Sequence, residues 1–444
     1  MKKYILIILC CLTSFPLWSY NVNMIVEHYS VDQGLPNNTV NCTLKDRDGF
    51  IWFGTWYGLC CFDGVKFKTF NKQEHDSDVP PRKIQRIVED KNGYIWVKTI
   101  DRKLYVFNKV TECFHAVYDD MKNYSENIQV IKLQNTAEGD VLLLTKDKNL
   151  LLAGVDEKGQ VTIKILFDSR NEINKHDYTL KHHVLCETEE YISWIGTDYK
   201  VSAVHKGAEL ASRPADFITS KINSGDKDSF TSFFEDGRKV WVGDRAGIFY
   251  SIDVRTGLVN RYVLSEIKGA ISNLLVTPAG YVYLSVAGQG TYEYDLAERR
   301  LQKINTEMND AMVTHAFIDQ YDKIWFHENE KALIYYDPLN HTAKRFPFTM
   351  FGKITTLYSE DAGERGLFFL SPAGEAWLFD REHAEMVYIN KLKQLSNDRT
   401  NQQFYHLMLD NDGVLWLSSA DEGVYCMNFP KKQFNLLSLS PQSP

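Results

Sequence analysis

Aromatic and planar polar side chains recur at one point of the sequence, directly after a series of short apolar segments. Such groups bind sugars, because aromatic faces stack on C–H surfaces while carboxylate, amide and guanidinium groups hydrogen-bond to hydroxyls. Solvated loops often have a similar composition, so these positions are candidate ligand-binding residues only. They are Trp56, Tyr57, Asp101, Arg102, Asp198, Tyr199, Asp244, Arg245, Gln289, His327 and Glu328, with Asp421 after the last segment.

Two of these residues are carboxylates that would make an acid–base pair if they faced each other. For Asp244 and Glu328, the separation of the carboxyl groups would then decide between retaining and inverting glycoside hydrolysis. The sequence contains no Gly-x-Ser-x-Gly, His-Glu-x-x-His or glycine-rich phosphate loop. We therefore predict that the chain is not an enzyme, has no catalytic residue and needs no cofactor.

A further set of carboxylates lies in turns that end in glycine. The segments Asp46–Gly49 and Asp410–Gly413 resemble cation-binding loops, but a calcium loop of the EF type needs more oxygen ligands and a glutamate at its twelfth position. Hairpin geometry accounts for both segments, since Asp starts a turn and Gly supplies a positive φ. We expect these turns to be structural, with no metal bound.

The apolar segments are copies of one repeat, in which an Asp-Gly turn leads into a strand-like run with a central tryptophan. The positions equivalent to Trp52 are 96, 142, 194, 241, 283, 325, 368 and 416, and the copies at 142, 283 and 368 are degenerate. A period of about 45 residues, with alternating apolar runs and turn residues at fixed offsets, predicts an all-β propeller with one four-stranded blade per unit. We expect the tryptophans to pack between neighbouring blades.

The repeat does not determine how many blades close the ring. Residues 25–29 resemble an unpaired outer strand, which in propellers commonly completes the last blade. Seven units would close near Phe346, which predicts a propeller over residues 20–349, two further blades over 350–434 as the start of a second propeller, and a tail over 435–444. The alternative is a single ring of eight or nine blades.

The N-terminus predicts a secreted protein. Lys2 and Lys3 precede the apolar stretch 4–12, and Ser19 offers a cleavage site, so residues 1–19 are predicted to be a signal peptide rather than a membrane span. No later apolar run is long enough to cross a membrane. The net charge of −8 makes nucleic acid an unfavourable partner. We therefore expect a periplasmic protein without a membrane span in the mature chain.

The first unit resembles the two-component regulator propeller repeat, which occurs in the periplasmic sensor region of hybrid two-component systems of Bacteroidetes. The matching residues are Tyr29-Ser30-Val31-Asp32-Gln33-Gly34-Leu35-Pro36-Asn37-Asn38-Thr39-Val40, followed by Asp46-x-x-Gly49-Phe50-Ile51-Trp52-Phe53-Gly54-Thr55 and Phe62-Asp63-Gly64. The resemblance implies a sensor that binds an oligosaccharide and controls glycan-utilisation genes. It also implies further sensor or kinase domains, or a homodimer, as partners.

The chain departs from this family pattern after the propeller region. In the family a second propeller, a β-sandwich, a membrane span, a histidine kinase and a receiver follow, whereas this sequence stops at Pro444. We interpret it as the N-terminal part of such a sensor, a truncated product or a stand-alone relative, without a catalytic output domain. The alternatives are a scaffold that docks proteins through exposed residues such as Trp56 and Tyr57, and a propeller glycosidase or lyase.

Overall fold

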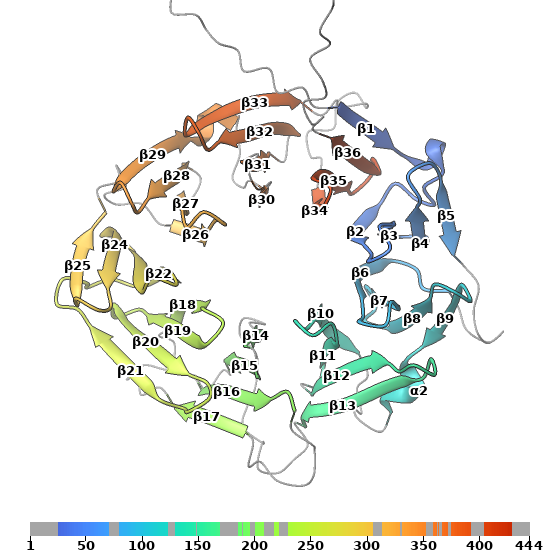
Figure 1. Ribbon diagram of the computed structural model, residues 1–444, viewed down its shortest axis with the longest axis horizontal. Coiled ribbons are helices and arrows are strands. Elements are labelled where there is room, and N and C mark those ends of the chain that lie inside the picture. The colour runs from blue at the N-terminus through green and yellow to red at the C-terminus, as the bar shows by residue number, and fades with distance from the viewer. Residues whose placement is uncertain are drawn as a thin grey trace, which may run out of the picture.

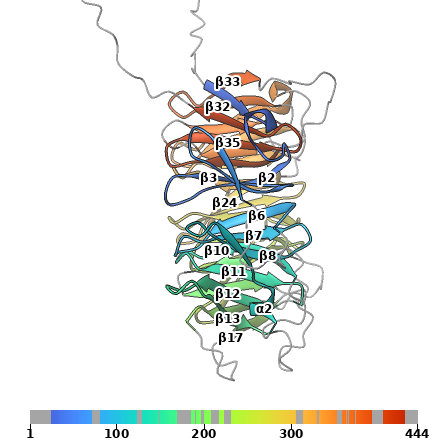
Figure 2. The ribbon, with the colours of Figure 1, turned by 90° about the vertical axis from the view of Figure 1, so that its right-hand side faces the viewer.

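The computed structural model arranges its strands around one ring, with the first strand of each sheet nearest the centre (Figure 1). Seen edge-on, the strands run between two flat faces (Figure 2). Within the described residues, no helix combines the length and apolar content needed to cross a membrane. The structure describes residues 25–428 except 71–79, 123–128, 148, 169–184, 189, 196–199, 208–216, 222–229, 305–312, 329–330, 352–357, 362, 364–365, 372–373 and 392–403, so the predicted signal peptide and tail lie outside it.

The described strands form nine antiparallel sheets of four strands, numbered here in chain order, which confirms the predicted four-stranded propeller blades. Sheets 1 to 3 contain β2 (Val40–Lys45), β3 (Ile51–Thr55), β4 (Gly58–Phe62) and β5 (Phe67–Phe70); β6 (Ile84–Glu89), β7 (Ile95–Thr99), β8 (Leu104–Asn108) and β9 (Cys113–Ala116); and β10 (Val130–Asn135), β11 (Val141–Thr145), β12 (Leu150–Val155) and β13 (Val161–Phe167).

The middle of the chain forms the next three sheets in the same order. Sheets 4 to 6 contain β14 (Leu185–Glu187), β15 (Tyr191–Ile195), β16 (Lys200–His205) and β17 (Phe217–Lys221); β18 (Phe230–Glu235), β19 (Lys239–Asp244), β20 (Ile248–Asp253) and β21 (Val259–Val263); and β22 (Ile271–Val276), β23 (Tyr281–Val286), β24 (Gly290–Asp295) and β25 (Arg300–Lys303).

The last three sheets follow, together with the short helices. Sheets 7 to 9 contain β26 (Val313–Ile318), β27 (Ile324–Glu328), β28 (Ala332–Asp337) and β29 (Thr342–Pro347); β30 (Tyr358–Asp361), β31 (Leu367–Leu370), β32 (Glu375–Asp380) and β33 (Glu385–Lys391); and β34 (Phe404–Leu409), β35 (Val414–Ser419), β36 (Val424–Asn428) and β1 (Ile25–Tyr29). The helices are η1 (Val31–Gln33), α2 (Tyr118–Met121) and η4 (Phe348–Phe351).

The ring closes through β1, but not at the seventh sheet. Sheets 7 and 8 each have their own fourth strand, whereas sheet 9 receives β1, which pairs with β36 from Ile25 opposite Asn428 to Tyr29 opposite Val424. At this joint Gly423 has φ 91°, and a Cβ there would lie 2.1 Å from the Tyr29 carbonyl oxygen. The prediction that an N-terminal strand completes the last sheet is therefore confirmed, and closure near Phe346 is wrong.

The expected boundary at residue 349 lies inside a continuous core. Phe348 and Phe351 of η4 are buried with Trp325 of sheet 7 and Trp377 of sheet 8 in one cluster. A boundary between two propellers would require few contacts across it. The structure thus favours the single-ring alternative over a second propeller that starts at residue 350.

Five recurring tryptophans with described side chains pack against the following sheet, and each is held there by the aspartate of its own turn. Trp52 lies in one cluster with Phe107 of sheet 2, and Trp416 of sheet 9 lies with Phe53 of sheet 1. Five indole Nε1 groups donate to such an aspartate, at 2.7 to 3.2 Å: Trp52 to Asp46, Trp96 to Asp90, Trp241 to Asp236, Trp325 to Asp319 and Trp416 to Asp410. The predicted packing between blades is confirmed for these tryptophans.

A cation directly after the third strand joins some neighbouring sheets at the same end. Lys109 of sheet 2 contacts Asp46 of sheet 1 and Glu89 at the end of its own first strand, at 3.0 and 2.8 Å. Arg381 makes the same pair of contacts between sheets 7 and 8, and Lys206 joins sheets 3 and 4 through Glu138, at the position of Asp48, and Glu187 of its own first strand. We call this arrangement the inter-sheet clamp.

The two faces of the ring carry different connections. The turns between first and second strands and between third and fourth strands, such as Asp46–Gly49 and Asp63–Lys66, lie on what we call the turn face. The connections between second and third strands, such as Trp56–Tyr57, and the links between sheets lie on the opposite loop face. Antiparallel order alone produces this segregation, because successive strands run in opposite directions.

Candidate functional site

The described candidate residues lie at or just after the ends of second strands, toward the loop face. Trp56 and Tyr57 connect β3 to β4, and Asp101 and Arg102 connect β7 to β8. Asp421 lies between β35 and β36 of sheet 9, and the remaining described positions lie in sheets 5, 6 and 7. Asp198 and Tyr199 are outside the described residues. The sequence could therefore place these residues on one face, but not show which of them are already engaged within the fold.

Asp244 and Glu328 have structural partners within their own sheets. Asp244 Oδ1 accepts hydrogen bonds from the backbone N–H groups of Ala246 and Ile248, at 2.9 and 2.8 Å. Burial raises the pKa of Asp244, and these N–H groups oppose that shift. Glu328 is buried and pairs with Arg345 at 2.9 Å. Sheet 6 lies between their two sheets, so the structure gives no support to these carboxylates as a facing acid–base pair.

Gln289 and His327 are also held by neighbouring groups. Gln289 Oε1 accepts from the Lys268 N–H at 2.7 Å, and its Nε2 donates to the Glu266 carbonyl at 3.2 Å, so the side chain fastens the link before β22. His327 Nδ1 lies 2.8 Å from Thr314 Oγ1. Burial and His315 lower the pKa of His327, which favours the neutral ring.

Trp56 and Tyr57 are the exposed aromatic residues among the described candidates. Their exposed fractions are 40% and 64%, and the Lys83 ammonium lies 5.2 Å from the centre of the Trp56 ring. Asp101, Arg102, Arg245 and Asp421 are exposed as well. Aromatic faces and charged hydrogen-bonding groups are thus available on the loop face of sheets 1 and 2.

Lys98 of β7 adds a buried cation that sequence reasoning missed. Its Nζ donates to Gln85 Oε1 and to the Ile131 carbonyl, both at 2.7 Å. Burial lowers the pKa of Lys98 to about 8, and the positive charges of Arg102 and Arg86 add to this effect. The sequence offered one sign that Lys98 is buried, which is its position within an apolar second strand. A lysine is usually expected to extend its ammonium group to solvent, so this sign did not predict a buried cation.

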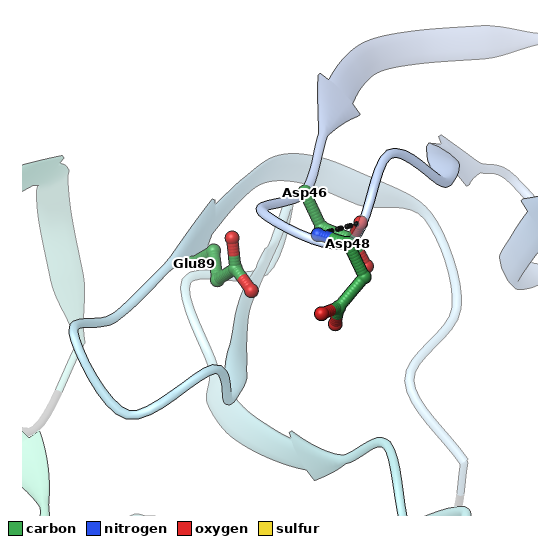
Figure 3. Close-up of side chains that lie close together, drawn as sticks. All are labelled: Asp46, Asp48 and Glu89. Atoms are coloured by element: carbon green, nitrogen blue, oxygen red, sulfur yellow. Dashed lines mark hydrogen bonds between the residues drawn. The ribbon is translucent and has the colours of Figure 1, made fainter.

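Three carboxylates gather on the turn face between sheets 1 and 2. Figure 3 shows Asp46, Asp48 and Glu89 close together. The Lys109 ammonium lies 3.0, 2.7 and 2.8 Å from their oxygens, and it occupies the place that a metal ion would take. Asp46 also accepts from the N–H groups of Asp48 and Phe50, as expected of a structural turn. The trio is an ion-pair network in this structure.

A cavity of about 550 Å³ lies on the turn face between sheets 6 and 7, away from the predicted residues. The sequence does carry a signal for it, because the degenerate sixth unit has Tyr283 where six units have tryptophan. Opposite it stands Glu293, whereas Cys61, Val106, Ser251, Tyr335 and Cys426 stand opposite the tryptophans. The lining residues are Thr277, Pro278, Ala279, Tyr281, Tyr283, Glu293, Arg300, Tyr321, Asp322, Lys323, Pro338, Leu339 and His341.

Solved structures of several proteins are similar to this chain over most of its length. The extracellular domain of a hybrid two component system from B. thetaiotaomicron is similar in structure, with 14% identity and a TM-score of 0.38 over 90% of this chain and 66% of that one. A second such domain from B. thetaiotaomicron has 14% identity and a TM-score of 0.34, over 94% and 61% of the two chains. Virginiamycin B lyase from Staphylococcus aureus, in a catalytically inactive form, has 12% identity and a TM-score of 0.42, over 67% and 94%.

This chain thus spans less than two thirds of one extracellular domain and about two thirds of the other. No curated protein sequence matches it. Residues 34–57 match the family model of the two component regulator propeller. These residues run from the end of η1 through β2 and β3 to the exposed pair Trp56 and Tyr57. The first sheet of the ring therefore carries a two component regulator propeller repeat.

Proposed function

We propose that this chain is the extracytoplasmic ligand-sensing propeller of a two-component regulatory system, and that it binds an oligosaccharide. The observation that carries the proposal is the two component regulator propeller repeat at residues 34–57, set in a ring of four-stranded sheets. The genes under its control would be those for use of the same glycan. Phosphoryl transfer would be the task of a kinase domain or partner.

The loop face of sheets 1 and 2 supports this proposal chemically. Trp56 and Tyr57 offer exposed ring faces, and Arg102 and Asp101 offer hydrogen-bonding groups on the neighbouring sheet. A sugar ring stacked on an indole would compete with the Lys83 ammonium for the same ring face. Signalling would follow if the ligand binds one arrangement of the sensor, or of a sensor dimer, more tightly than another.

A protein-docking scaffold is the second candidate function. The exposed Trp56 and Tyr57 favour it as well, because aromatic side chains dominate the energetics of protein interfaces. The two candidates differ in whether free sugars bind to the isolated chain.

Calorimetry of residues 20–444 with a panel of oligosaccharides tests the proposal, with the same mixtures assayed for products. We expect binding without turnover. The double variant Trp56→Ala, Tyr57→Ala should keep its melting temperature within a few degrees, since only a cation–π contact of about 1 kcal/mol is lost. If the pair contacts the ligand, affinity should fall about tenfold, as for loss of one stacked ring.

Phe50→Ala is the matched control, because Phe50 is an equally exposed aromatic residue on the opposite face. It should leave binding unchanged. Turnover of any sugar would instead establish an enzyme, and binding of no sugar would leave the scaffold as the better account.

A further inference from the structure

The joint between sheets 6 and 7 lacks both contacts that close other joints on the turn face, which are the aspartate–tryptophan hydrogen bond and the inter-sheet clamp. Thr277 stands where Asp46 and its equivalents accept the indole, and Tyr283 stands where they have tryptophan. Pro338 takes the place of the clamp cation directly after the third strand, and Ile318 replaces the acid at the end of the first strand. The phenol ring of Tyr283 is smaller than an indole, and no ion pair between described residues fills the joint. The cavity lies in the space that is left between the two sheets.

The floor of the cavity is a buried carboxylate held by tyrosines. Glu293 has an exposed fraction of 6%, and its Oε2 accepts from the Tyr283 hydroxyl at 2.9 Å and from the Tyr336 hydroxyl at 3.4 Å. Burial and the charge of Glu293 raise the pKa of Tyr283, so the tyrosine keeps its proton and donates. Among the described residues no lysine, arginine or histidine pairs with Glu293, and no hydrogen bond to its Oε1 is present.

This arrangement leaves one charged acceptor for a ligand that can donate hydrogen bonds. Glu293 lines the cavity, and a hydrogen bond from a ligand hydroxyl to a carboxylate oxygen is stronger than one between neutral groups. Lys323 is engaged by Asp337 at 2.7 Å and so does not neutralise the floor. An acidic ligand would therefore be repelled by Glu293.

The walls supply flat apolar surface around this acceptor. Tyr281 lines one side from β23, and Tyr321 lines the other side from the turn of sheet 7, while Tyr283 is 1% exposed and contributes its hydroxyl to the floor. Arg300 and His341 are exposed lining residues that offer further polar groups. A volume of about 550 Å³ is within the usual range of small-molecule sites, and it suits one or two sugar rings.

We propose that the cavity between sheets 6 and 7 binds a neutral sugar unit of one or two rings, with hydroxyls donating to Glu293 Oε1 and ring faces stacked on Tyr281 and Tyr321. The proposal rests on the proposed function, since it places the saccharide site of the sensor. It moves that site from the loop face, where sequence analysis expected it, to the turn face on the opposite side of the ring.

Calorimetry with neutral disaccharides (maltose, cellobiose, lactose, xylobiose) and with glucuronic acid tests the placement on residues 20–444. We expect one or more of the neutral sugars to bind and the acid not to bind. For the best neutral sugar, Glu293→Gln should weaken binding at least tenfold, because a charged acceptor becomes a neutral one. Ala279→Trp, an exposed turn substitution at the cavity, should abolish binding by filling it.

Lys158→Trp is the matched control for Ala279→Trp, because Lys158 also precedes a positive-φ glycine in an exposed turn. It should bind as the unmodified chain does, and Trp56→Ala, Tyr57→Ala should do so too. Loss of affinity in that double variant, with Glu293→Gln and Ala279→Trp unaffected, would overturn the cavity site and leave the proposed function intact. Failure of every sugar to bind would overturn both, and binding of glucuronic acid alone would overturn the cavity chemistry.

Discussion

Replacing Trp416 with alanine is expected to lower the free energy of unfolding by about 3–5 kcal/mol. The side chain is 5% exposed and joins sheet 9 to sheet 1, with ring centres 5.8 Å from Phe53 and 5.9 Å from Phe62. The truncation leaves a cavity at the joint that closes the ring. It also leaves the buried Asp410 without the indole N–H that donates to it at 3.1 Å. Urea unfolding followed by circular dichroism measures the change.

Trp56→Ala is the control for this prediction, because Trp56 is 40% exposed and does not belong to the buried clusters of sheet 1. It should change the free energy of unfolding by less than about 1 kcal/mol. Equal stability of the two variants would show that Trp416 does not carry the contact between sheets 9 and 1.

Replacing Lys109 with methionine should cost roughly 3 kcal/mol at neutral pH, since it removes the cation that three carboxylates share. Of Asp46, Asp48 and Glu89, only Glu89 keeps another ion-pair partner, Arg47 at 3.2 Å. The Lys109 side chain is largely buried, and so are those of Asp46 and Glu89. The same experiment on Lys68→Met gives a matched control, because the Lys68–Glu112 pair is exposed on both sides. Exposed pairs contribute about 0–1 kcal/mol, so this variant should be nearly as stable as the unmodified chain.

The deficit of the Lys109→Met variant should shrink on acidification. Lys109 lowers the pKa of Asp48 in the folded chain, so that stabilisation is present above the unfolded pKa of about 3.9 and is lost as the pH falls through the lower folded value. In the variant, protonation instead relieves repulsion among the carboxylates. Thermal melts from pH 7 down to about pH 3 should therefore bring the two proteins closer together below about pH 4, and a constant or growing difference would contradict the network.

The blades were predictable from sequence because one physical device recurs. The Asp-Gly turn and the following tryptophan stand at fixed offsets, since the aspartate accepts both turn N–H groups and the indole. Closure at the seventh unit was wrong because outer strands carry a weak pattern. β29 is mostly exposed, with Phe346 as its one buried side chain, so the sequence does not reveal which sheet lacks a fourth strand of its own.

The candidate site was predicted less completely than the fold, and the reason is chemical. A carboxylate that binds sugar and one that accepts turn N–H groups look identical in sequence, and Asp244 is of the second kind. The cavity could have been found by comparing units rather than single positions. A unit that lacks the turn aspartate or the tryptophan, as at Thr277 and Tyr283, is not unusual by itself. The joint between sheets 6 and 7 is distinguished because all four positions differ there and Glu293 stands opposite Tyr283.

The pairing of β1 with β36 also has a kinetic consequence. The two strands lie far apart in the sequence, and the contact between His28 and Glu422 joins residues 394 positions apart. Pairings of such long sequence separation form slowly, because the loop-closure entropy must be lost before the contact forms. Until then two strand edges, on β36 and on β1, stay open to other chains. The nascent ring is therefore most prone to aggregation just before its last joint forms, and a chaperone that covers one edge would protect it.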